Sequence, residues 1–113
     1  MGEFITVKRW RLKEGRQEAE LLDLVRGSIV PHYKQLSDAV RLGLWRIDGT
    51  RSYLALQHWQ SRADWESATQ SESYRGWFRR YAPILERWDE IMELEGEWES
   101  EDVLGPGEVA AGC

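Results

Sequence analysis

The chain has 113 residues, of which 42% are hydrophobic and 31% charged, a composition typical of one globular domain rather than a fibrous or largely disordered protein. Its net charge is −5, its basic residues are scattered, and no uncharged apolar segment approaches the ~20 residues of a membrane span, so we expect neither a nucleic-acid partner nor a membrane partner. The single cysteine, Cys113, excludes an intrachain disulfide and favours a cytoplasmic location.

The first half of the chain predicts a strand, a helix and a hairpin. Residues 4–12 are rich in apolar and β-branched side chains, which favours a strand. Residues 16–36 carry apolar side chains at steps of three and four, which predicts a helix. Pro31 lacks a backbone N–H, so we expect a kink or a break there. Residues 39–48 and 53–59 predict two strands joined by a turn that contains Asp-Gly.

The second half predicts two helices, a last strand and a tail. Residues 61–70 read as a short helix capped by its first serine. Residues 71–88 show the apolar stripe of a longer amphipathic helix, which Pro83 is expected to kink or restart. Residues 91–98 predict a strand with apolar side chains on one face and glutamates on the other. Residues 100–113 have few apolar anchors and predict a flexible acidic tail.

This order of elements predicts an α+β, ferredoxin-like βαββαβ fold over residues 1–99, with one antiparallel sheet and the helices on one face. Two helices can cover only one face of such a sheet. Three of the strands nevertheless carry apolar residues on both faces, which favours a second copy of the chain as the cover of the other face. The opposed sets are Ile5 and Val7 against Phe4, Trp10 and Leu12; Val40, Leu42 and Leu44 against Trp45 and Ile47; and Leu54 and Leu56 against Tyr53, Ala55 and Trp59.

Several segments of the chain resemble the dimeric α/β-barrel superfamily and, within it, the antibiotic-biosynthesis-monooxygenase-like domains. The resemblance covers about residues 3–99 and implies a homodimer that forms a dimeric α/β barrel. Besides the first strand, the segments are Ser28-Ile29-Val30-Pro31-His32-Tyr33, His58-Trp59-Gln60-Ser61-Arg62-Ala63-Asp64-Trp65 and Tyr81-Ala82-Pro83-Ile84-Leu85.

The resemblance also implies chemistry. Oxygenases of this superfamily use neither metal nor flavin: their substrate, usually a phenol or quinol, is deprotonated and its carbanion reduces dioxygen. Such a reaction needs an apolar aromatic cavity, a proton acceptor, and donors for the developing oxyanion. Several active members use an asparagine, and this chain contains none.

The candidate site residues surround a pocket that we expect between the helices and the sheet. His58, at its polar end, is the predicted proton acceptor, and Tyr74 is the second catalytic candidate. Each candidate also has a simpler interpretation as a packing residue, and His32 is expected on a helix surface. The predicted substrate-binding residues are Trp65, Trp77, Tyr33, Tyr81, Arg41 and Trp59.

Three functions fit this pattern. The first is a cofactor-independent monooxygenase-like protein that acts on a small aromatic, quinol or polyketide-type substrate, with no cofactor and no metal. The second is a non-catalytic small-ligand-binding or structural dimer on the same scaffold. The third is haem binding or degradation, with His32 or His58 as the ligand to iron.

Overall fold

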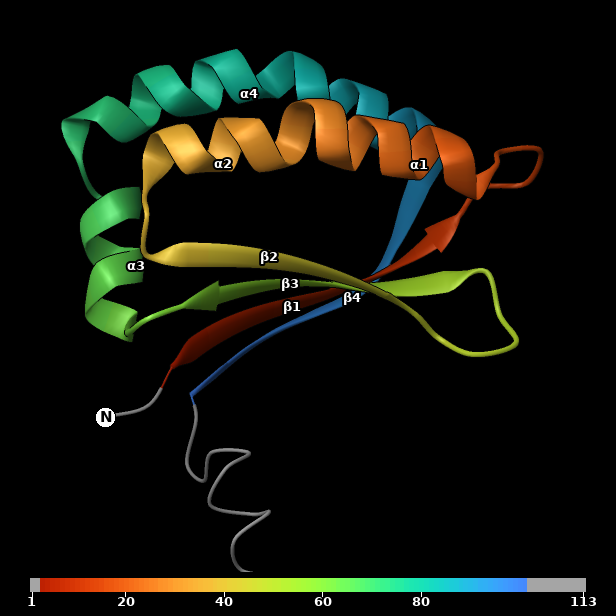
Figure 1. The fold of residues 1–113 in the computed structure, drawn as a ribbon, viewed down its shortest axis with the longest axis horizontal. Helices are drawn as coiled ribbons and strands as arrows, with labels where there is room; N and C mark the ends of the chain where they lie inside the picture. The colour runs from red at the N-terminus through yellow and green to blue at the C-terminus, as the bar shows by residue number, and fades with distance from the viewer. Residues whose placement is uncertain (1–2, 102–113) are drawn as a thin grey trace, which may run out of the picture.

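The computed structural model describes residues 3–101, and its elements follow the predicted βαββαβ order, which confirms the α+β, ferredoxin-like fold (Figure 1). The tail predicted from residue 100 begins inside the last strand, and residues 102–113 lie outside the described residues. In chain order the elements are β1 (Phe4–Leu12), α1 (Glu18–Leu24), the π-helix η1 (Val25–Ile29), α2 (Val30–Leu36), β2 (Val40–Arg46), β3 (Ser52–Trp59), α3 (Arg62–Thr69), α4 (Glu72–Ile91) and β4 (Met92–Glu101).

The four strands form one antiparallel sheet in the order β2-β3-β1-β4. Helices α1, α2 and α4 lie side by side over one face of it, and α3 closes one end (Figure 1). Phe4 and Val40 both pair with Trp59, so alternate residues along the three strands share the helix-covered face. No helix among residues 3–101 is long and apolar enough to cross a membrane.

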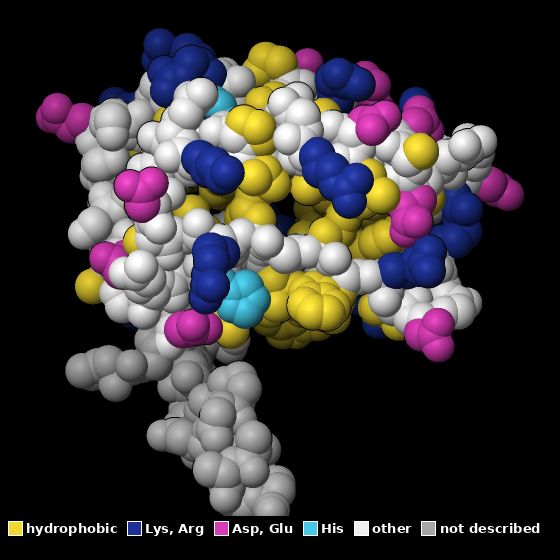
Figure 2. All heavy atoms as spheres, viewed as in Figure 1, with side chains coloured by type: hydrophobic (Ala, Val, Ile, Leu, Met, Phe, Trp, Pro, Cys, Tyr) yellow, Lys and Arg dark blue, Asp and Glu magenta, His cyan; other side chains and the backbone are white. Residues whose placement is uncertain are grey.

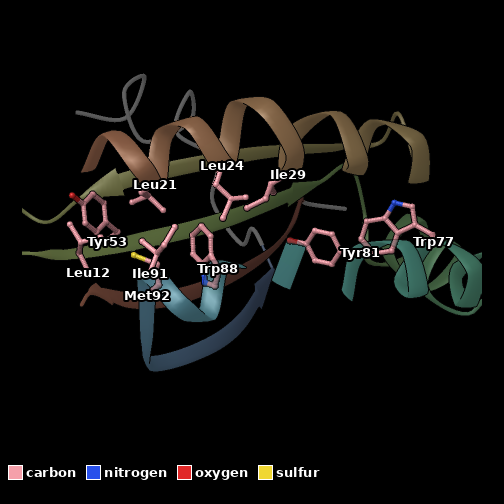
Figure 3. Close-up of a cluster of buried hydrophobic side chains, with 10 residues drawn as sticks. All are labelled: Leu12, Leu21, Leu24, Ile29, Tyr53, Trp77, Tyr81, Trp88, Ile91 and Met92. Carbon is pink, nitrogen blue, oxygen red and sulfur yellow. The ribbon is translucent and has the colours of Figure 1, made fainter. Parts of the chain in front are cut away.

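The hydrophobic core fills the space between this covered face and the helices. At one end of the molecule, side chains of α1 pack over the junction of α4 and β4 (Figure 3). At the other end, Trp77 and Tyr81 of α4 continue the cluster beneath α2. Phe4 and Trp59 are almost fully buried where α3 meets the sheet.

The two prolines inside predicted helices have different outcomes. The chain stays helical from α1 to α2, but it leaves α geometry in η1, directly before Pro31. There the N–H of Val30 donates to the carbonyl of Val25, five residues back. This wider turn precedes the position where Pro31 cannot make an α-helical hydrogen bond. By contrast, α4 runs through Pro83 as one helix, so the restart expected there does not occur.

A β-bulge in β4 corrects the predicted pattern of that strand. Leu94 pairs with Trp10, but the next pair along β1 joins Arg9 to Gly96, which leaves Glu95 as the extra residue. Beyond the bulge the alternation is reversed relative to the simple period-two prediction. Trp98 therefore shares the open face of the sheet, and Glu97 lies on the covered face, opposite Lys8.

The open face of the sheet carries two cross-strand rows of residues that are apolar except for Arg9. Each row has a tryptophan on one edge strand and a glycine on the other. Trp45 is 63% exposed and Trp98 is 55% exposed, although both are large and apolar. The rows are Gly43, Leu56, Val7 and Trp98, followed by Trp45, Leu54, Arg9 and Gly96.

Both exposed tryptophans lie back against a glycine of their own strand. A Cβ atom on Gly43 would lie 3.1 Å from Nε1 of Trp45, and one on Gly96 would lie 3.0 Å from Cη2 of Trp98. Because glycine has no side chain, each indole can lie close to the strand.

Candidate functional site

A cavity of about 710 Å³ lies mainly between the covered face of the sheet and the helices, and its lining also includes Gly43, Leu56 and Trp98 of the open face. Figure 2 shows it as a hollow with hydrophobic side chains inside, open between the helix layer and the edge strand β2. This volume is within the range of small-molecule sites in proteins. Aromatic residues dominate its lining, and those from the helices and sheet include Trp10, Tyr33, Trp59, Trp65, Tyr74, Trp77, Phe78, Tyr81 and Trp88.

His32 and Trp77 join α2 to α4 at the back of the cavity. The indole Nε1 of Trp77 donates to the His32 carbonyl at 2.7 Å, and Nε2 of His32 lies 2.9 Å from the Trp77 carbonyl. The His32 ring also stacks on the rings of Trp77 and Tyr81, with centroids 4.6 and 5.3 Å away. His32 is therefore buried, and its predicted place on the helix surface is wrong. The reciprocal contacts hold this wall of the cavity in one arrangement.

A second set of hydrogen bonds connects β3 of the sheet to α2. The Trp59 indole Nε1 donates to Oε1 of Gln57 at 3.0 Å, and Nε2 of Gln57 donates to the Tyr33 hydroxyl at 3.0 Å. The Tyr33 ring meets the Tyr81 ring edge-on, with centroids 5.5 Å apart. The polar atoms of the cavity thus form a chain rather than isolated contacts, and isolated buried polar groups would be costly.

The cavity tyrosines are neutral hydrogen-bonding groups rather than bases. Burial raises the pKa of Tyr33 far above its usual range and raises the pKa of Tyr81 to about 12. Burial also raises the pKa of Tyr74. All three hydroxyls therefore keep their protons at neutral pH, so they can donate to a carbonyl or to a developing oxyanion.

Charged residues line the cavity only toward β1 and β4. Nζ of Lys8 lies 4.0 Å from Oε2 of Glu97, and Glu99 follows on the same face of β4. Because Glu97 is well exposed, this end of the cavity is in contact with solvent. The two glutamates are the carboxylates of the lining, and they reach it because the bulge reverses the alternation of β4.

Most of the predicted site residues come together in this cavity. They come from α2, the end of β3, and both C-terminal helices, segments that are far apart in the sequence. The tyrosine and tryptophan candidates that line the cavity are Tyr33, Trp59, Trp65, Tyr74, Trp77 and Tyr81.

His58 and Arg41 lie elsewhere. They pair with each other across β2 and β3 on the open face of the sheet, so His58 is not at the polar end of the cavity. Nδ1 of His58 is 3.6 Å from Oε2 of Glu3, and Nη2 of Arg41 is 3.9 Å from Oε1 of the same carboxylate. The reason is strand parity, because Trp59 faces the helices and the residue before it must face away.

Several lining residues were not predicted from the sequence. Gln57 shares the covered face with Trp59, two residues later. This period-two relation is the feature of the sequence that could have predicted Gln57 as a lining residue. Trp88 was recognised only as part of an apolar stripe, whereas Glu97 depends on a bulge that the sequence pattern hides. Among residues 3–101 no three His, Cys, Asp or Glu side chains gather closely enough to hold a metal ion.

Comparison with known proteins gives a match in structure but not in sequence. No protein-family model matches the chain, and no curated protein is similar to it in sequence. SnoaB, a cofactor-independent oxygenase from Streptomyces nogalater, is 17% identical, with 92% of this chain and 98% of that chain covered and a TM-score of 0.61. An alanine variant of SnoaB covers 96% of this chain and all of its own, with 16% identity and a TM-score of 0.67.

A third structure comes from Chloroflexus aurantiacus and is provisionally described as an antibiotic biosynthesis monooxygenase. It is 15% identical, with 94% of this chain and 98% of that chain covered and a TM-score of 0.53. Identities this low speak for the fold, since unrelated chemistries share folds. The chain therefore has the fold of the antibiotic-biosynthesis-monooxygenase-like proteins, as its sequence resemblance predicted.

Proposed function

We propose that the protein is a cofactor-independent monooxygenase-like enzyme that binds a planar phenol or quinol in the aromatic cavity. The observation that carries this proposal is the combination of an aromatic wall with hydroxyl donors that stay neutral, at Tyr33, Tyr74 and Tyr81. Stacked rings suit a flat ligand. Neutral hydroxyl donors suit an oxygen atom that gains negative charge during the reaction.

The chemistry requires only the substrate and dioxygen. A substrate methylene next to the phenol system loses a proton, and the resulting carbanion transfers an electron to dioxygen. The two radicals combine to a peroxide, which loses water, so that CH₂ and O₂ become C=O and H₂O. In this proposal Tyr74 donates to the substrate oxygen, and Glu97 or Glu99 accepts the proton at the charged end of the cavity.

Oxygen uptake with anthrone tests the proposal, because anthrone carries such a methylene and its oxidation product is anthraquinone. With a chelator present, we expect equal amounts of oxygen consumed and anthraquinone formed, at a rate well above that without protein. Tyr74→Phe should lower the rate by about 10²-fold, the loss typical of one oxyanion donor. Tyr53→Phe is the matched control, because the Tyr53 hydroxyl bonds to Glu18 outside the cavity lining.

One observation favours the second function, a non-catalytic ligand-binding protein. His58, the predicted base, lies on the opposite face of the sheet from the cavity. Anthrone that binds without faster oxygen uptake would support this second function over the first. Haem ligation by His32 is less well supported, because its Nε2 is bonded to the Trp77 carbonyl and its ring stacks on the rings of Trp77 and Tyr81.

We propose in addition that two copies pair through their open sheet faces. A two-fold axis that runs along the strands between β1 and β3 would place β2 of each copy over β4 of the other. Trp45 would then lie opposite the partner's Gly96, and Trp98 opposite the partner's Gly43. The exposure of both tryptophans supports this pairing, because large apolar patches mark interfaces. The cytoplasmic location stays a prediction.

A further inference from the structure

The hydrogen-bond chain in the cavity has a direction that the chemistry of its members determines. An indole N–H can only donate, so the side of Gln57 that faces Trp59 must be its carbonyl oxygen. The amide nitrogen of Gln57 then faces Tyr33 and can only donate to it. The Tyr33 oxygen is thus an acceptor at this contact, and its own proton is directed onward.

The chain ends at Tyr81. The neighbouring hydroxyl is that of Tyr81, whose ring meets the Tyr33 ring edge-on with centroids 5.5 Å apart. Their interaction favours the protonated form of Tyr33 and the ionised form of Tyr81, which is the pattern of a bond donated by Tyr33, so the Tyr81 proton is left for another partner. No residue in the described range 3–101 accepts that proton. Figure 3 shows the Tyr81 hydroxyl pointing away from Trp77, toward the side of Trp88. Because Tyr81 lines the cavity, a bound ligand is the partner that can supply an acceptor.

Trp88 supplies a second donor of the same kind. Its side chain is 5% exposed and lines the cavity, and within residues 3–101 its Nε1 is the one buried side-chain nitrogen or oxygen without a hydrogen-bond partner. Such groups are rare in proteins and call for an explanation. Tyr81 and Trp88 are seven residues apart on α4, which places their backbone atoms on one face of the helix about 10 Å apart along its axis. The Tyr81 side chain points toward Trp88, so the two donors lie closer together than the backbone atoms (Figure 3).

We propose that the cavity selects a planar ligand with two hydrogen-bond acceptors on opposite edges, one bound by the Tyr81 hydroxyl and one by the Trp88 indole N–H. In this proposal Gln57 is a positioning residue that makes Tyr81 a donor. The inference rests on the proposed function, since it assigns a ligand class to the same cavity. Carbonyl or phenolate oxygens on opposite sides of a fused ring system meet the requirement.

Anthraquinone and anthracene are suitable probes, because they share a ring system and differ by two carbonyl oxygens. Their affinities are measured by equilibrium dialysis, with the folded state of each variant checked by circular dichroism. Tyr81→Phe and Trp88→Phe should each lower the ratio of anthraquinone to anthracene affinity by about 5-fold, the effect of one neutral hydrogen bond. Tyr53→Phe should leave the ratio unchanged, because its hydroxyl lies outside the lining.

Gln57→Glu tests the positioning role directly. An ionised carboxylate only accepts, so Tyr33 would donate to it and accept from Tyr81, which reverses the chain. The variant should therefore lose anthraquinone affinity by about 5-fold as pH rises and its carboxyl ionises, while anthracene affinity stays constant. The pH dependence of the wild-type affinities, measured in parallel, is the control for titration of the charged lining residues Lys8, Glu97 and Glu99.

The outcomes separate the two proposals. An unchanged affinity ratio in Tyr81→Phe and Trp88→Phe, or a pH profile of Gln57→Glu that matches wild type, overturns the inference while the cavity keeps its function. Should Trp88→Phe not fold, the other two variants still decide. If neither probe binds the wild-type protein, the cavity is not an aromatic site, and the proposed function fails together with the inference.

Discussion

The two faces of the sheet use the same residue types for different purposes. On the covered face, tryptophans and tyrosines surround a cavity, and nearly every buried polar atom among the described residues has a partner. On the open face, two tryptophans lie close to glycines of their own strands and remain more than half exposed. Aromatic content alone therefore does not identify a site. Concavity and a connected set of polar groups distinguish the candidate ligand face from the proposed contact face.

The largest expected effect is the loss of Trp77, which anchors the covered face. Trp77→Ala removes a buried side chain that stacks on three rings and donates to His32. We expect the free energy of unfolding to fall by about 3–5 kcal/mol, as is typical for Trp→Ala in a core. Denaturant titration measures this. Phe78→Ala, one residue along and 44% exposed, should cost much less, and equal losses would contradict the rigid-wall interpretation.

A charge on the open face should act on association instead. Val7 lies in the central strand β1, close to the proposed two-fold axis, so Val7→Arg would bring two like charges together. We expect the dimer to weaken by at least about 100-fold, or ~2.7 kcal/mol. Light scattering would then show the 13.3 kDa chain mass in place of twice that value. Ala19→Arg adds the same charge to an exposed helix position and should leave the dimer intact.

Alkaline pH should weaken the covered face. Burial raises the pKa of Tyr81 to about 12, above the value of about 10 expected in the unfolded chain. The folded protein therefore retains a proton that the unfolded chain loses, so the stability from Tyr81 is complete below pH 10 and declines as pH rises toward 12. Tyr81 alone should contribute a slope that approaches about 1.4 kcal/mol per pH unit within this window, and Tyr33, whose pKa is also raised by burial, adds to it. Denaturant titrations at successive pH values measure it, and Tyr81→Phe should reduce the slope.

The smallest expected effect concerns the end wall of the cavity. Ser61 caps α3 by accepting the N–H of Asp64 at 3.1 Å, and α3 carries Trp65. Ser61→Ala should cost about 1 kcal/mol of unfolding free energy, the usual value of an N-cap. Ser67→Ala, at an exposed position within the same helix, is the control. Because α3 covers only one face of the sheet, a change in dimer affinity in Ser61→Ala would show that the two faces are coupled.

Local sequence patterns predicted most of the fold. The first strand was predicted with its observed limits, and the serine cap of α3 was predicted from its spacing. Period-two alternation also predicts the face on which His58 lies, because His58 shares a face with Leu54 and Leu56 rather than with Trp59. The error came from using proximity in the chain to α3 as a guide to position in space.

Other features depend on tertiary structure and had no local signal. His32 is buried because Trp77, 45 residues away, packs against it: the Trp77 indole N–H donates to the His32 carbonyl, and the His32 Nε2 contacts the Trp77 carbonyl. The chain from Trp59 through Gln57 to Tyr33 forms only when β3 and α2 meet. The faces of β4 beyond Leu94 depend on its pairing with β1, since the Glu-Leu-Glu-Gly-Glu sequence alone fits a regular strand.

The bulge at Glu95 gives β4 a tolerance to changes in length during evolution. Two residues, Glu95 and Gly96, occupy the space opposite Arg9, so loss of one codon there would leave a regular ladder with the later residues still in register. Trp98 would stay on the open face and Glu97 on the covered face. An insertion or deletion elsewhere in the strand would exchange the two faces. Loss of this one residue would thus leave both the cavity lining and the proposed contact surface of β4 unchanged.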